Sequence, residues 1–270
     1  MSNLNCAVIC IARLEGNYIR EFVEYYLALG FSKIIIADNN HDGEDDLDVI
    51  DDYVKNGQVI IEDYKNQVKA QMKAYTELYL KYGNEFDWLL MCDIDEYLVL
   101  EKHKTIQEFL EDKKDYESVL INWKTYGDSG QIYADYSKPV MERFTIPCPN
   151  AKSQYSFEDD YHVKSIVKGG LPKVIWYSNP HTVTNPLRCC NAKGERCDQT
   201  PFQIPDHTVA HFNHYTTKSL EEYCENKTRR GAGDRSYDCF KATYKGRYFR
   251  INEITKEKLK WIKEHGYEWI

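Results

Sequence analysis

The stretch from Phe86 to Leu98, FDWLLMCDIDEYL, joins a strongly apolar run to three carboxylates within four residues. Residues 88–92 have the composition of a strand that is buried on both faces. Asp93, Asp95 and Glu96 follow directly after it. Ionised carboxylates beside a core cost free energy unless a cation or hydrogen-bond donors pair them. The stretch therefore predicts a fold whose buried strand ends in a paired acidic cluster.

The rest of the chain extends this pattern into an α/β fold. Further apolar strands are expected at residues 5–12, 33–37, 58–62 and 118–123, with amphipathic helices at 15–29 and 68–82 between them. Strands that alternate with helices predict a doubly wound, mostly parallel sheet. We expect a loop-like segment at 179–206 and a C-terminal elaboration with helices at about 217–230 and 254–264. Residues 1–270 are predicted to form one domain.

Composition excludes several classes of protein. The chain has 270 residues, 42% of them hydrophobic, which is enough for a packed core. Its net charge of −8 disfavours a nucleic-acid partner, because phosphate binding needs a basic face. No apolar run reaches the length of a membrane span, and the N-terminus lacks the features of a signal peptide. Nine cysteines, several inside apolar runs, favour a reduced, cytoplasmic protein.

The acidic stretch predicts a metal site. Ligands of open α/β sheets bind beyond the carboxyl ends of the strands. Asp93 and Asp95 lie at such an end and offer the hard oxygen ligands that Mn²⁺ or Mg²⁺ prefers, and the same ion can hold a diphosphate. The alternative is a solvated turn. Two roles for Glu96 stay open. It could contact the acceptor or a ligand of the metal, or it could be a charge that favours a helix N-terminus.

Several motifs resemble glycosyltransferases. The opening residues 9–40, ICIARLEGNYIREFVEYYLALGFSKIIIADNN, and the stretch DWLLMCDIDEYL are similar to GT-A enzymes of the family 2-like group. The later segments resemble family 92-like bacterial enzymes of surface polysaccharide synthesis; they are WKTYGDSG from Trp123, KPVMERF from Lys138, HVKSIVKGG from His162, NPH from Asn179, and HYTTKSLEEYCENKTRRG from His214.

The resemblance implies a GT-A fold and transfer of a sugar from a nucleotide-diphosphate donor, with a UDP-sugar favoured. It also implies an inverting reaction, a glycan or lipid-linked acceptor, and a role in capsule or lipopolysaccharide synthesis at the cytoplasmic face of the membrane. Residues 1–125 would then bind the nucleotide-sugar and residues 126–270 the acceptor. Asp93, Asp95 and His214 are the predicted metal ligands, with His211 as the rival of His214.

Donor-binding and catalytic candidates lie elsewhere in the chain. The predicted contacts to the nucleotide-sugar come from Arg13, Asp38, Asp93, Lys218 and Arg230. For Arg13, a surface ion pair is the open alternative. An inverting transfer needs a general base, for which the candidates are Asp128 in YGDSG and Glu158, with Asp159 and Asp160, in SFEDDYH. Lys164 is either an acceptor or phosphate ligand or a lysine at a strand edge.

Other interpretations stay open. A sugar-phosphate nucleotidyltransferase shares the α/β layout, although the segment ARLEGN lacks the Gly-rich, basic loop expected there. A non-catalytic carbohydrate-binding protein would use the abundant aromatic residues to stack on sugars. The tail KEKLKWIKEHGYEWI resembles a basic amphipathic helix, so peripheral membrane contact is an expectation to test. Cys189, Cys190 and Cys197, with His207 and His211, form a weak zinc pattern.

Overall fold

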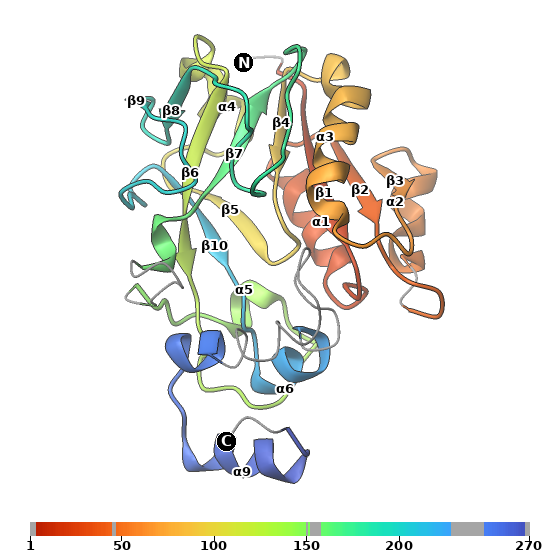
Figure 1. Cartoon of the computed structure of the whole chain (residues 1–270), viewed down its shortest axis with the longest axis vertical. Helices are drawn as coiled ribbons and strands as arrows, with labels where there is room; N and C mark the ends of the chain where they lie inside the picture. The colour runs from red at the N-terminus through yellow and green to blue at the C-terminus, as the bar shows by residue number, and fades with distance from the viewer. Residues whose placement is uncertain (1–3, 45–46, 150, 152–157, 228–245, 268–270) are drawn as a thin grey trace. The chain divides into compact units, whose positions relative to one another are not determined.

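The computed structural model describes residues 4–44, 47–149, 151, 158–227 and 246–267 (Figure 1). The strands are β1 (Cys6–Ala12), β2 (Lys33–Asp38), β3 (Val59–Asp63), β4 (Trp88–Met91), β5 (Glu96–Leu100), β6 (Ser118–Thr125), β7 (Val163–Lys168), β8 (Cys189–Asn191), β9 (Arg196–Cys197) and β10 (Ala210–His214). The α-helices are α1 (Ile19–Ala28), α2 (Asp51–Lys55), α3 (Ala70–Tyr82), α4 (Ile106–Leu110), α5 (Val140–Arg143), α6 (Leu220–Glu222) and α9 (Lys256–Glu264).

The strands form one sheet in the order β3-β2-β1-β4-β7-β6-β10-β5, and β8 and β9 extend it beside β6. β3, β2, β1 and β4 run parallel to one another. β7 runs antiparallel to both β4 and β6. The predicted α/β class is confirmed, and the parallel part of the sheet is built from the strands that the sequence predicts. The pattern did not predict β5, β7 and β10, nor β8 and β9, which lie in the segment 179–206 expected to be a loop.

The helix α3 covers one face of the parallel strands. Its buried side chains Ala74, Leu78 and Tyr79 belong to the same cluster as Ile9 and Met91. Alternate residues of a strand point to opposite faces of a sheet, so this cluster contains the residues of each strand that point toward α3. The other set is buried too, because β1 and β4 are buried along almost their whole length. The two-sided burial explains why these strands read as continuous apolar runs.

The chain divides into two compact units. The first comprises residues 1–123 and 161–213, and the second comprises residues 124–160 and 214–270. The predicted boundary after residue 125 falls close to the first change of unit, whereas residues 161–213 return to the first unit. The second unit has its own apolar cluster, which includes Leu220, Tyr223, Tyr248, Trp261 and Ile262.

The C-terminal helices differ from the prediction in detail. The predicted helix at 217–230 begins at Leu220, where a capping box between Ser219 and Glu222 starts α6. A π-helical turn, Tyr223–Lys227, follows it. The predicted helix at 254–264 is α9, whose N-cap is Thr255. None of the helices in the described segments combines the length and the apolarity that crossing a membrane requires.

Candidate active site

The acidic stretch folds into a tight turn at the carboxyl end of β4. The amide of Glu96 donates to the carbonyl of Asp93 at 3.1 Å, and the amide of Asp93 donates to Glu96 Oε2 at 3.0 Å. The residue after the turn starts β5, so the chain changes direction within four residues. Glu96 is therefore fully buried at the start of a strand, and the helix N-terminus considered for it is wrong.

Asp93 is held by three donors from two elements. Gln71 Nε2 of α3 donates to Asp93 Oδ1 at 2.5 Å, and the Tyr75 hydroxyl lies 3.1 Å from the same oxygen. Lys164 Nζ of β7 donates to Asp93 Oδ2 at 2.9 Å. Both carboxylate oxygens of Asp93 thus have protein partners.

Lys164 also contacts Glu96. Its Nζ lies 3.3 Å from Glu96 Oε2, and neither side chain is exposed. Because β7 lies between β4 and β6, Lys164 is a central residue of the sheet, and the strand-edge interpretation is wrong. Burial alone would lower the pKa of Lys164, but the charges of Asp93 and Glu96 outweigh it and hold that pKa above its ordinary value. Lys164 therefore carries a buried positive charge.

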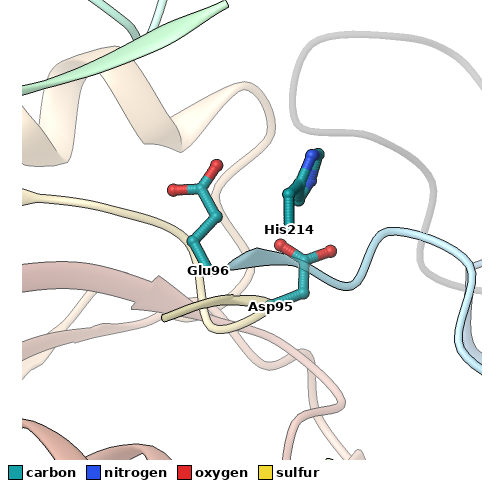
Figure 2. A group of neighbouring side chains, drawn as sticks. All are labelled: Asp95, Glu96 and His214. Atoms are coloured by element: carbon teal, nitrogen blue, oxygen red, sulfur yellow. The ribbon is translucent and has the colours of Figure 1, made fainter. Parts of the chain in front are cut away.

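Asp95 and Glu96 are the acids that could hold a cation. Ligand atoms of Asp95, Glu96 and His214 lie within 4.8 Å of one another, and Figure 2 shows the three side chains gathered at the end of the strands. His214 is the last residue of β10, the neighbour of β5 in the sheet. Burial raises the pKa of Glu96 well above its ordinary value, although Lys164 opposes the shift. A bound cation would favour the ionised form.

The donor set fits a divalent cation. Glu96 Oε1 is buried and has no hydrogen-bond partner among the described residues, so it is an oxygen that a cation would satisfy. Carboxylate oxygens with one imidazole nitrogen suit Mn²⁺, and carboxylates alone suit Mg²⁺. This set contains the predicted ligands Asp95 and His214, and it holds Glu96 in place of Asp93.

The predicted nucleotide contacts of the first unit lie in the loops after β1 and β2. Asp38, the last residue of β2, accepts two hydrogen bonds from Asn40 and lies 3.4 Å from Lys65 Nζ. Arg13 forms a two-point ion pair with Glu44, at 2.7 and 2.8 Å. The ion pair considered for Arg13 is thus present, and its contact with a nucleotide stays a prediction, as does that of Asp38.

The predicted bases belong to the second unit. Asp128 is 3% exposed, its Oδ2 lies 2.6 Å from Lys258 Nζ, and Tyr248 donates to the same oxygen. To accept a proton from a substrate, this carboxylate would have to leave these partners. Glu158 is half-buried, and the acids after it are engaged, Asp159 with Arg247 and Asp160 with the Thr125 amide. The choice of base stays a prediction.

Of the two basic residues predicted to contact the donor, Lys218 and Arg230, the structure describes Lys218. Lys218 is 6% exposed and has a left-handed backbone, with φ of 53°, which is uncommon outside glycine. Non-glycine residues in this region cluster at functional sites. Its role at the donor stays a prediction. Arg230 lies outside the described residues.

The structure also bears on the zinc pattern and on the expected membrane contact of the C-terminal helix. The described residues offer no metal group besides Asp95, Glu96 and His214, so Cys189, Cys190, Cys197, His207 and His211 do not assemble a zinc site there. In α9, Trp261 and Ile262 are buried against Leu220 and Tyr248, so these apolar side chains are not free to enter a lipid surface.

Comparison with known families completes this description. The profile of glycosyltransferase family 92 matches residues 7–247. The chain belongs to glycosyltransferase family 92. The resemblance noted in the sequence is therefore confirmed. Membership of this family favours a glycosyltransferase over the nucleotidyltransferase and carbohydrate-binding interpretations. The comparison with curated proteins found no match.

Solved structures with similar folds include TarS of S. aureus. The match to TarS 1–349 in complex with UDP covers 49% of this chain and 38% of that one, at 15% identity and a TM-score of 0.36. The match to TarS 1–349 in complex with UDP-GlcNAc covers 96% of this chain and 79% of that one, at 11% identity and a TM-score of 0.47. The match to a nucleotide-diphospho-sugar transferase of Desulfovibrio desulfuricans G20 covers 44% of this chain and 58% of that one, at 10% identity and a TM-score of 0.29. The chain spans less than half the length of the first two TarS chains that it matches.

Sequence reasoning missed two residues of this family 92 site, Gln71 and Tyr75, and considered Lys164 only as an acceptor or phosphate ligand or as a strand-edge lysine. Gln71 and Tyr75 are one helical turn apart on α3, and Tyr75 reads as one of the apolar residues of that face. Lys164 lies inside the buried part of β7, whereas Lys168 ends the strand, and a lysine among apolar residues within a strand is the signal that marks it. The partner of each residue lies far away in the sequence, so only the folded sheet identifies it.

Proposed function

We propose that this glycosyltransferase is metal-dependent and moves a sugar from a UDP-sugar to a glycan or lipid-linked acceptor, with inversion, in cell-surface polysaccharide synthesis. The observation that carries the proposal is the buried Asp95–Glu96 pair at the carboxyl end of β4, with the unpartnered oxygen of Glu96. Parallel α/β sheets bind their ligands at this edge. Mn²⁺ or Mg²⁺ bound there would offset the negative charge that grows on the leaving diphosphate.

In the proposed transfer, an acceptor hydroxyl attacks the anomeric carbon and forms the new glycosidic bond. The bond between that carbon and the diphosphate oxygen breaks, and its electron pair leaves with the nucleoside diphosphate. The hydroxyl proton passes to a carboxylate base, for which Asp128 and Glu158 are the candidates. Asp95 and Glu96 would hold the cation, which would supply positive charge for the diphosphate, while Arg13, Asp38 and Lys218 would contact the nucleotide-sugar.

The test is thermal denaturation with UDP, GDP, CDP and their sugar conjugates, each with and without Mn²⁺. A ligand that binds only the native state raises the melting temperature, by an amount equivalent to about 2.7 kcal/mol at a hundredfold excess over its Kd. We expect a Mn²⁺-dependent shift with UDP and UDP-sugars. No shift with any nucleotide, in folded protein, would contradict the donor proposal.

Asp95→Ala is the matching variant. We expect it to lose the Mn²⁺-dependent shift and to reduce transfer by at least about 100-fold, because the charge on the leaving group is no longer offset. Asp51→Ala is the control, since Asp51 is an exposed acid whose partner is Lys55. Full transfer activity in folded Asp95→Ala would sink the metal proposal.

A further inference from the structure

Lys164 occupies a position that packing does not explain. Its side chain is fully buried in β7, between β4 and β6. A buried ammonium costs free energy unless carboxylates compensate for it, and an apolar residue of similar volume is often more stable at such a position. A lysine in the centre of the sheet therefore indicates a task in the adjoining site.

The contacts of Lys164 separate the three acids of the turn. Nζ lies 2.9 Å from Asp93 Oδ2 and 3.3 Å from Glu96 Oε2. The same Glu96 oxygen accepts the Asp93 amide at 3.0 Å. Lys164 thereby ties one oxygen of Glu96 to the turn, and the other, Oε1, is the buried oxygen without a hydrogen-bond partner.

Asp93 already has protein donors on both carboxylate oxygens. Gln71 and Tyr75 contact its Oδ1, and Lys164 occupies its Oδ2. A cation that coordinated Asp93 directly would compete with these hydrogen bonds and with the charge of Lys164. Glu96 Oε1 has no such bond to lose.

We propose that Lys164 is a positioning residue of the donor site, which holds Asp93 back from the cation and presents Glu96 Oε1 to it beside Asp95. The two acids of the Asp-x-Asp motif then have different tasks. Asp95 and Glu96 supply the carboxylate oxygens, and Asp93 fixes the turn to α3 and β7. This inference rests on the proposed metal dependence.

Direct binding of Mn²⁺ tests the inference without reliance on activity. Free Mn²⁺ is measured by electron paramagnetic resonance during titration of the protein in the presence of UDP. We expect Glu96→Gln to weaken Mn²⁺ binding by more than about tenfold, and Lys164→Met to weaken it by about 10- to 100-fold, as loss of a ligand-orienting contact does. Asp93→Asn is expected to stay close to the wild-type affinity.

Lys168→Met is the matched control. Lys168 ends the same strand, but its Nζ donates to the Lys114 carbonyl, away from the turn. It should leave Mn²⁺ binding unchanged. The double variant Glu96→Gln/Lys164→Met removes one charge of each sign, so we expect it to recover thermal stability relative to Lys164→Met without recovering Mn²⁺ affinity.

The outcomes separate the two proposals. If the wild type binds Mn²⁺, and Asp93→Asn abolishes that binding while Glu96→Gln leaves it intact, the inference is overturned but the proposed metal dependence is not. A folded Lys164→Met variant with wild-type Mn²⁺ affinity would do the same. If the wild type itself binds no Mn²⁺ with UDP, the metal-dependent function and the inference are both overturned. The comparison of Asp93→Asn with Glu96→Gln decides the question even where Lys164→Met does not fold.

Discussion

Arg143 and Glu222 form a buried, two-point ion pair in the second unit. Both guanidinium–carboxylate distances are 2.9 Å, and the Ser219 amide adds a third donor to Glu222 at 3.1 Å. Burial alone would raise the pKa of Glu222, but the hydrogen bonds and charge of Arg143 outweigh it and hold the pKa below its ordinary value. The pair therefore stabilises the fold only while Glu222 is ionised.

This pair predicts a pH dependence. Because the folded pKa of Glu222 is lowered, its contribution is complete above the unfolded pKa of about 4.3 and is lost as the pH falls through the folded pKa. Glu222→Gln removes the carboxylate charge that faces the buried Arg143 at 2.9 Å, so we expect a loss of about 3–5 kcal/mol in unfolding free energy at pH 7. Urea unfolding at decreasing pH should show the difference between variant and wild type narrowing. A difference that is constant down to pH 3 would refute the ionic origin.

At the scale of the element, α9 is fixed to the second unit by polar and apolar contacts together. Lys258 is 1% exposed and pairs with Asp128, while Trp261 and Ile262 enter the apolar cluster. The Thr255 side chain accepts the Lys258 amide and caps the helix. An amphipathic sequence here serves internal packing, although the same pattern is typical of a helix at a membrane surface.

Lys258→Met tests this anchor. It leaves the Asp128 carboxylate buried without a countercharge, so we expect a loss of about 3–5 kcal/mol in stability, measured by urea unfolding. Asp128→Asn/Lys258→Met removes both charges and should regain most of that loss.

Transfer activity of the double variant then addresses the base. Retained activity in the folded double variant would assign Asp128 to the anchor and leave Glu158 as the base candidate. A folded but inactive double variant would support Asp128 as the base. Lys260→Met is the control, because Lys260 is an exposed lysine of the same helix.

At the scale of the whole molecule, sequence order and spatial order differ. β4 lies between β1, which precedes it, and β7, which comes about 75 residues later. The first unit is therefore complete only when residues 161–213 have joined residues 1–123. A cut after residue 125 removes β7 and β10 and exposes the edges of β4, β5 and β6.

This arrangement predicts the behaviour of a fragment. We expect residues 1–125 alone to lack a cooperative unfolding transition and to aggregate, because unpaired strand edges are templates for association. Thermal unfolding followed by circular dichroism, with size-exclusion chromatography, measures this outcome. The full chain is the control. A soluble, cooperatively folded fragment would show that β7 is dispensable for the parallel strands.

The sequence by itself determined the parallel strands, the covering helices and the family. Their signals are local, since β1, β2 and β4 are buried on both faces and α1 and α3 repeat apolar residues at helical spacing. It also placed Asp93 and Asp95 at the carboxyl end of a strand, which is a consequence of chain order alone.

Only the tertiary structure decided which groups pair with these acids. Lys164 reaches Asp93 across 71 residues of sequence, and Lys258 reaches Asp128 across 130. Strand periodicity says which residues are buried, but the pairing of strands decides what a buried charge meets. The strands β5 and β10 were not predicted from the sequence, and their pairing in the sheet sets the position of Glu96 and His214. Buried charges need partners, and in this chain the sheet brings those partners from distant segments.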